Sequence, residues 1–173
     1  MPLIATIRSR REGGGRSIPD SERLELFKNI LPLVDAIDLE LNSNRLRKVL
    51  APLARRRSKR VILSYHNFRS TPPDSTLLKL VEKVRRGGAD LIKIALTPKG
   101  KRDVARLLLF TYRNRDKNLI TIAMGRRGVP SRILAPLFGS LLTYSFVGRS
   151  QAPGQLSIDE LSKEIQAYFP RLV

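Results

Sequence analysis

One lysine stands in the middle of an apolar stretch of the sequence. The stretch ADLIKIAL, residues 89–96, surrounds Lys93 with leucine, isoleucine and alanine. A buried ammonium group costs free energy unless it is paired, and burial lowers its pKa. A lysine that stays partly neutral is an amine nucleophile, suited to forming a Schiff base with a carbonyl compound. The alternative is a structural lysine, whose ammonium reaches the strand end or pairs with a carboxylate such as Glu40 or Asp90.

A second set of candidates lies just after other apolar runs. His66 follows the run RVILSY, and Arg8 and Glu12 lie in RSRREGGG. A histidine side chain titrates near neutral pH and can move protons in catalysis. A hydrogen-bonded loop histidine and a charged turn are the structural alternatives. Neither phosphate-loop pattern, GxGxxG or GxxxxGK[ST], occurs at a strand–helix junction, so no nucleotide site is predicted.

Short apolar runs alternate with segments of helical periodicity along the whole sequence. The runs predict strands at residues 3–7, 34–41, 60–65, 89–96, 118–124 and 141–148. The intervening segments predict helices at residues 20–33, 43–56, 74–86, 99–115, 129–139 and 157–168. Six βα units of this kind favour an α/β fold, with a parallel sheet covered by helices, in a single domain over residues 1–173.

The predicted sheet brings the chemical candidates together. Functional side chains of parallel sheets gather at the C-terminal ends of the strands and in the loops that follow. Those positions carry Arg8, Glu12, Glu40, His66, Lys93, Met124 and the loop of residues 148–155. A lysine nucleophile beside a histidine acid/base is a working pair for carbonyl chemistry.

Composition narrows the classes of protein. The 173 residues include no cysteine and one histidine, which excludes disulfides and multi-histidine metal sites. No apolar run reaches the roughly 18 residues of a membrane span, and the start lacks a signal-peptide pattern, so we expect a cytoplasmic protein without a membrane partner. The net charge of +18 suits either a nucleic-acid-binding protein or the basic surface of a heat-adapted one. Few aromatic residues are present to stack on bases, so we expect no nucleic-acid partner.

Several of these segments together resemble the type I 3-dehydroquinate dehydratases, the Schiff-base-forming class of the shikimate pathway. The matching stretches are TIRSRREGG, VDAIDLEL, SYHNF, DLIKIAL, TIAMG, GVPSR and QAPGQ. They cover nearly the whole chain in the family's order. The resemblance implies a (β/α)8 TIM-type barrel that dehydrates 3-dehydroquinate to 3-dehydroshikimate by syn elimination, without a metal or cofactor, in a homodimer.

The resemblance also assigns roles to single residues. It implies that Lys93 forms the Schiff base, that His66 is the general acid/base, and that Glu12 positions the histidine. The substrate-binding residues that it implies are Arg8, Glu40, Met124, Arg132, Gln151 and Gln155. Gln151 stands where some family members carry a serine.

The start of the chain departs from the family. Two βα units normally precede the strand that ends in the Arg…Glu-Gly-Gly motif, and here that strand begins at residue 3. Three explanations are open: a start given too far downstream, a degenerate remnant, or a second chain that covers the open edge. The intact site residues favour the first explanation. An open sheet exposes its edges, so we expect an unstable or associated chain. An inactive remnant, a Schiff-base aldolase and a nucleic-acid-binding protein are the alternatives in function.

Overall fold

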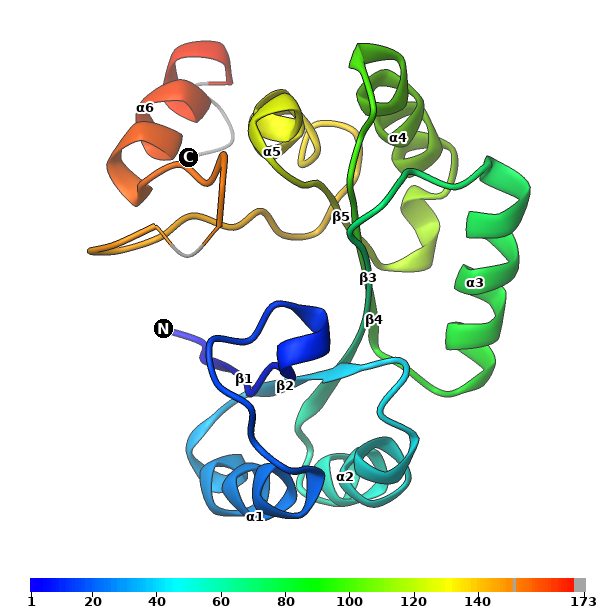
Figure 1. Cartoon of the computed structure of the whole chain (residues 1–173), viewed down its shortest axis with the longest axis vertical. Helices are drawn as coiled ribbons and strands as arrows, with labels where there is room; N and C mark the ends of the chain where they lie inside the picture. Colours follow the sequence, from blue (N-terminus) through cyan, green and yellow to red (C-terminus); the bar gives the residue numbers. More distant parts are fainter. Residues whose placement is uncertain (151, 170–173) are drawn as a thin grey trace. The chain divides into compact units, whose positions relative to one another are not determined.

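The computed structural model describes residues 1–150 and 152–169, and within them strands and helices alternate (Figure 1). The strands are β1 Ile4–Thr6, β2 Ala36–Glu40, β3 Arg60–Asn67, β4 Leu91–Leu96 and β5 Leu119–Ala123. They form one sheet in the order β1-β2-β3-β4-β5, and the β1–β2 and β2–β3 pairs are parallel. The predicted α/β class is therefore confirmed.

Helices follow the strands as the periodicity predicted. They are α1 Asp20–Ile30, α2 Asn44–Arg56, α3 Asp74–Arg86, α4 Lys101–Arg113, α5 Val129–Leu134 and α6 Ile158–Tyr168. In α3 the predicted apolar face is correct, because Leu77, Val81 and Val84 are all buried. The helix predicted at 129–139 is shorter than expected and ends at Leu134.

One compact unit comprises Met1–His66 and Lys79–Lys93. In it the register of β2 against β3 sets Leu39 beside Leu63. Helices α1 and α2 pack against each other beside β1 and β2, as Figure 1 shows. Phe27 of α1 and Leu46 of α2 are fully buried. Apolar burial in this unit holds the ends of β1, β2 and β3 in place.

The second compact unit comprises Asn67–Leu78 and Ile94–Val173. Helices α4 and α5 both pack on β5, and α5 contacts α6. Helix α6 begins with a capping box, in which Ser157 accepts from the Glu160 amide and the Glu160 carboxylate accepts from the Ser157 amide. Because β4 and α3 contribute residues to both units, the prediction of a single domain stays a prediction.

The sixth predicted strand, at residues 141–148, is wrong. In this segment the structure has one isolated bridge, from Phe146 to Ser157. The reason lies at β5, whose amides at Thr121 and Ala123 donate to the hydroxyls of Ser140 and Ser131. Those side chains take the hydrogen bonds that a further strand would need, so the segment passes β5 as irregular backbone.

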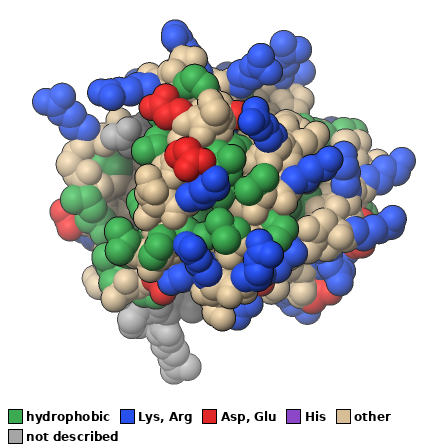
Figure 2. Space-filling view, turned by 90° about the horizontal axis from the view of Figure 1, so that it is seen from below, with side chains coloured by type: hydrophobic (Ala, Val, Ile, Leu, Met, Phe, Trp, Pro, Cys, Tyr) green, Lys and Arg blue, Asp and Glu red, His purple; other side chains and the backbone are tan. Residues whose placement is uncertain are grey.

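The surface is strongly basic. Figure 2 shows one face of the molecule, on which Lys and Arg side chains outnumber acidic ones and surround apolar side chains. The net charge of +18 is therefore carried by exposed groups such as Arg56, Arg57, Arg85 and Arg86. None of the helices within residues 1–150 and 152–169 is long and apolar enough to cross a membrane.

One glycine tests the packing of α5 on β5. A Cβ atom added to Gly128 would collide with the backbone carbonyl of Ala123, and backbone cannot move aside as a side chain can. We expect Gly128→Ala to lower the free energy of unfolding by about 1–3 kcal/mol, measured by urea denaturation. Gly15→Ala is the matched control, because a Cβ there meets nothing within 4 Å. Equal losses in the two variants would contradict this packing.

Candidate active site

The lysine of β4 is buried and paired with an aspartate of β2. The Lys93 side chain is 9% exposed, and its Nζ lies 3.0 Å from Oδ2 of Asp38, whose side chain is fully buried. The sequence analysis named Glu40 or Asp90 as structural partners, whereas the carboxylate that holds the ammonium is Asp38. Sequence reasoning missed Asp38, although an acid inside an apolar strand is the same signal that singled out the lysine.

Asp38 also forms an ion pair with Arg8. Arg8 places Nη2 2.7 Å from Oδ2 of Asp38, and its Nη1 donates to the Ser64 hydroxyl at 2.6 Å. Burial alone would raise the pKa of Asp38, but Lys93, Arg8 and the Ser64 hydrogen bond outweigh burial and lower it below 3.8. Asp38 is therefore ionised at neutral pH. Its other oxygen, Oδ1, is buried and has no hydrogen-bond partner in the described part of the chain.

The histidine is held by a glutamate from the loop after β1. His66 Nδ1 lies 2.8 Å from Glu12 Oε2, and the two side chains are 10% and 9% exposed. The amide of Asn42 donates to the other Glu12 oxygen at 3.4 Å. A carboxylate beside Nδ1 favours the tautomer with its proton on that nitrogen, which makes Nε2 the basic atom of the neutral ring. A histidine oriented by a carboxylate in this way is an arrangement that can perform general acid/base catalysis.

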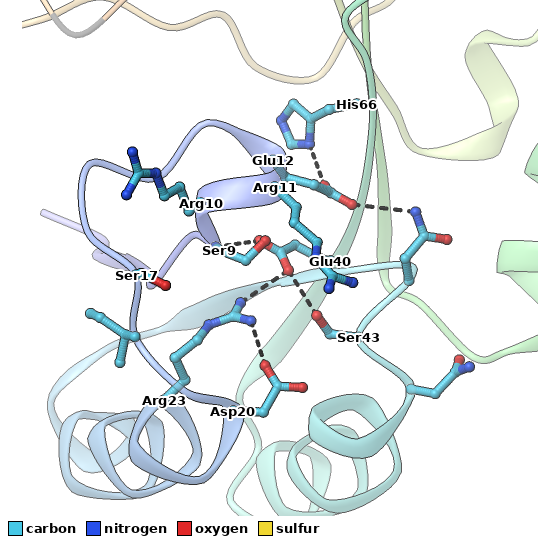
Figure 3. Close-up of a pocket in the computed structure, with 13 residues that line it drawn as sticks. Ser9, Arg10, Arg11, Glu12, Ser17, Asp20, Arg23, Glu40, Ser43 and His66 are labelled. Atoms are coloured by element: carbon cyan, nitrogen blue, oxygen red, sulfur yellow. Dashed lines mark hydrogen bonds and ion pairs between the residues drawn. The ribbon is translucent and has the colours of Figure 1, made fainter.

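A polar pocket of about 580 Å³ opens beside this pair (Figure 3). Its lining includes Glu12, His66 and Asn42, together with the buried residues Arg23 and Glu40. The short 3-10 helix Arg10–Glu12 also lines it, and its residues are labelled in the figure. Glu12 and His66, which the sequence analysis placed after strands, thus meet beside this pocket.

Glu40 is the last residue of β2, and both oxygens of its carboxylate have hydrogen-bond or ion-pair partners. It is 3% exposed; Oε1 accepts from the Ser9 amide at 2.6 Å, and Oε2 accepts from the Ser43 hydroxyl at 2.7 Å. Arg23 Nη2 lies 3.1 Å from Oε2. Burial raises the pKa of Glu40, but the Ser9 amide, the Ser43 hydroxyl and the charge of Arg23 together lower it below 4.5. Its role as a substrate ligand stays a prediction.

The remaining predicted residues belong to the second unit. Arg132 of α5 is 5% exposed and donates from Nη1 to the Tyr144 carbonyl, while its buried Nε has no partner in the described residues. Burial lowers the pKa of the Arg132 guanidinium. Met124 follows β5 and is half-buried, and Gln155 donates to the Ser145 carbonyl. Gln151 lies outside the described residues. In residues 1–150 and 152–169, no three His, Cys, Asp or Glu side chains gather as a metal site would need.

The sequence matches a known family over nearly its whole length. The family model described as type I 3-dehydroquinase matches residues 1–169. The chain belongs to this family. It is 38% identical over 167 residues to the 3-dehydroquinate dehydratase of Methanococcoides burtonii, covering 96% of this chain and 71% of that protein. It is 39% identical to that of Pyrococcus abyssi, covering 92% of this chain and 73% of that protein.

Solved structures of type I family members agree with the fold. The 3-dehydroquinate dehydratase of Geobacillus kaustophilus superposes with a TM-score of 0.88 at 35% identity, covering 98% of this chain and 69% of that chain. A type I enzyme from Clostridium difficile, solved with covalently modified comenic acid, has the same TM-score at 34% identity, covering 96% of this chain and 68% of that one. These neighbours have the TIM-barrel fold, so the predicted fold type is confirmed, with five strands rather than six in the part of the chain that the structure describes.

The shared aspartate predicts a pH-dependent stability difference. Asp38→Asn leaves two buried cations without their anion and should lower the free energy of unfolding by about 3–5 kcal/mol at pH 7. The pKa of Asp38 is lower in the folded protein than its ordinary 3.8, so its contribution is present above about pH 4 and is lost as pH falls through the folded value. Urea denaturation across pH 2–7 should therefore show the difference between the two proteins shrinking in acid. A difference independent of pH would contradict the ion pairs.

Proposed function

We propose that this chain dehydrates 3-dehydroquinate to 3-dehydroshikimate through a lysine Schiff base, as a step of the shikimate pathway and of aromatic amino acid biosynthesis. The observation that carries the proposal is the buried Lys93, held 3.0 Å from Asp38, in a chain of the type I 3-dehydroquinase family. The relatives named 3-dehydroquinate dehydratase supply the substrate and the reaction class, which is that of a carbon–oxygen lyase.

Schiff-base formation begins with Lys93 as a neutral amine. Its nitrogen adds to the ketone carbon C3 of the substrate to give a carbinolamine. The carbinolamine hydroxyl takes up the proton that the ammonium released and leaves as water, so a protonated imine remains. The nitrogen carries a positive charge in the resting ammonium and again in the protonated imine. Asp38, with its lowered pKa, balances that charge in both states. Covalent catalysis of this kind replaces one difficult step by two easier ones.

His66 moves the protons in the elimination of water. The protonated imine withdraws electrons from the adjacent C2–H bond, and His66 removes that proton through Nε2 while Glu12 holds the Nδ1 proton. The electron pair moves into the ring and expels the C1 hydroxyl, which His66 protonates so that it leaves as water from the same face. Hydrolysis of the product imine then releases 3-dehydroshikimate and restores Lys93.

The substrate's carboxylate and hydroxyls need fixed partners. We assign the carboxylate and nearby hydroxyls to Arg8 and Arg132, because guanidinium groups bind such oxygens in bidentate fashion. Nε of Arg132 is a buried donor that has no hydrogen-bond partner in the described residues, which supports this assignment for Arg132. The further contacts proposed from the family resemblance are Glu40, Met124, Gln151 and Gln155. A homodimer, a cytoplasmic location and a heat-adapted host stay predictions.

Trapping the imine tests the proposal directly. Borohydride added with 3-dehydroquinate should reduce the imine to a stable adduct, which a peptide map should locate at Lys93. Lys93→Met should give no adduct, because it removes the amine but keeps a side chain of similar length. Lys48→Met, at an exposed position of α2, is the control and should react like the unmodified protein. Folded protein without an adduct would overturn the Schiff-base mechanism.

Removal of the histidine should separate the two chemical stages. We expect His66→Ala to lower kcat about 10²- to 10⁴-fold, the range contributed by one positioned acid/base group. Absorbance of the conjugated enone product measures turnover. The imine should still be trapped in this variant, because the amine of Lys93 is intact. An unchanged kcat would show that another group moves the C2 proton.

A further inference from the structure

We propose that the buried ion pair between Arg23 and Glu40 is a positioning device for the active site, which fixes the backbone on both sides of Arg8 and thereby the loop that carries Glu12. The assignment rests on the proposed function, since Glu12 and His66 must act in the reaction for their placement to matter. Neither Arg23 nor its helix α1 supplies any of the groups that the sequence analysis assigned to catalysis.

Arg23 reaches from α1 to the end of β1. It is only 1% exposed, and Nε and Nη2 donate to the Ile7 carbonyl at 3.0 and 2.8 Å. Its Nη1 donates to Asp20 at 2.9 Å, and its Nη2 lies 3.1 Å from Glu40. The planar guanidinium fork therefore binds one backbone carbonyl and two carboxylates at fixed angles.

Glu40 holds the backbone on the other side of Arg8. Its Oε1 accepts from the amide of Ser9, and the Ser9 carbonyl in turn accepts from the amides of Glu12 at 3.0 Å and Gly14 at 2.9 Å. The 3-10 helix Arg10–Glu12 is thus hydrogen-bonded to Ser9, whose own amide is held by Glu40. Figure 3 shows Arg23, Glu40 and Ser9 joined beneath Glu12 and His66.

These contacts link one ion pair to both chemical groups of the site. The Ile7 carbonyl and the Ser9 amide belong to the two peptide groups that flank Arg8. The side chain of Arg8 then reaches Asp38, the partner of Lys93. The loop that continues from Ser9 carries Glu12 to His66. A change in the ion pair would therefore move Arg8 and Glu12 together.

Stability alone is a weak reason for this arrangement. Two charges lose their hydration when they are buried, and a well-packed apolar pair of similar size is often as stable or more so. The ion pair instead fixes the orientation of the backbone, because Glu40 binds the Ser9 amide and Arg23 binds the Ile7 carbonyl. A misplacement of about 1 Å far from the reacting atoms can cost about 100-fold in rate. The geometry of the loop is therefore a sufficient reason to bury Arg23.

The single histidine makes the placement measurable without substrate. His66 is the only histidine in the chain, so the two ring nitrogens give unambiguous signals in ¹⁵N NMR spectra. At a pH where the ring is neutral, the unmodified protein should show one tautomer, with the proton on Nδ1 facing Glu12. Arg23→Leu should give a mixture of tautomers and a kcat lowered about 10- to 100-fold. Arg23→Lys, which keeps the charge but lacks the fork, should lie between them.

Phe27→Leu is the matched control on the same helix. Phe27 is fully buried, but its side chain has no polar atom that could hold the Ile7 carbonyl or the Ser9 amide, so this variant should lower Tm while it leaves the His66 tautomer and kcat unchanged. A single Nδ1 tautomer with full kcat in both Arg23 variants would overturn the proposal, as would equal tautomer mixing in Phe27→Leu. If Arg23→Leu does not fold, Arg23→Lys decides by the same criteria. Absence of turnover in the unmodified protein would count against the proposed function, while the tautomer measurement would still test the positioning device.

Discussion

The carboxylate of Asp38 is the point on which the candidate site depends. A fully buried anion lies between two cations, with Lys93 on one side and Arg8 on the other. Each cation would be costly in an apolar interior without it, and the anion would be costly without them. Its lowered pKa keeps the charge in place at neutral pH. The positions of β2, β4 and the end of β1 are thereby coupled through one side chain.

This coupling suits the proposed chemistry because the charge on the lysine nitrogen is the same before and after the imine forms. A fixed counter-ion needs no rearrangement between those states, which is the advantage of a preorganised site. In the proposed mechanism a separate pair, His66 and Glu12, transfers the protons. The buried pair of Arg23 and Glu40 supports both groups, since it binds the backbone from which Arg8 and Glu12 extend. In this proposal the ion pairs of three carboxylates, Asp38, Glu12 and Glu40, serve the covalent, proton-transfer and positioning roles respectively.

Local pattern and the family resemblance predicted much of the site. Lys93 was singled out because a charge within an apolar strand is unusual, and His66 and Glu12 because they follow strands; the structure brings the last two into contact. The apolar face of α3 followed from its spacing. The sixth strand failed because its sequence is apolar, yet hydroxyls of Ser131 and Ser140 already occupy the amides of β5. The residues of segment 141–148 do not reveal that other side chains already bind the exposed edge of β5.

The sequence by itself determined the places of strands β1–β5 and of the helices that follow them, and which charged side chains they carry, because those depend on periodicity along the chain. The partners of those charges were decided by tertiary structure alone. Asp38 and Glu40 are two residues apart in β2, so strand alternation assigns them to the same face and cannot distinguish them. Only their positions along neighbouring strands and helix α1 give Asp38 to Lys93 and Arg8, and Glu40 to Arg23. Ion pairing acts over a few ångströms in space, and residues 30 or more apart in sequence meet only when the chain has folded.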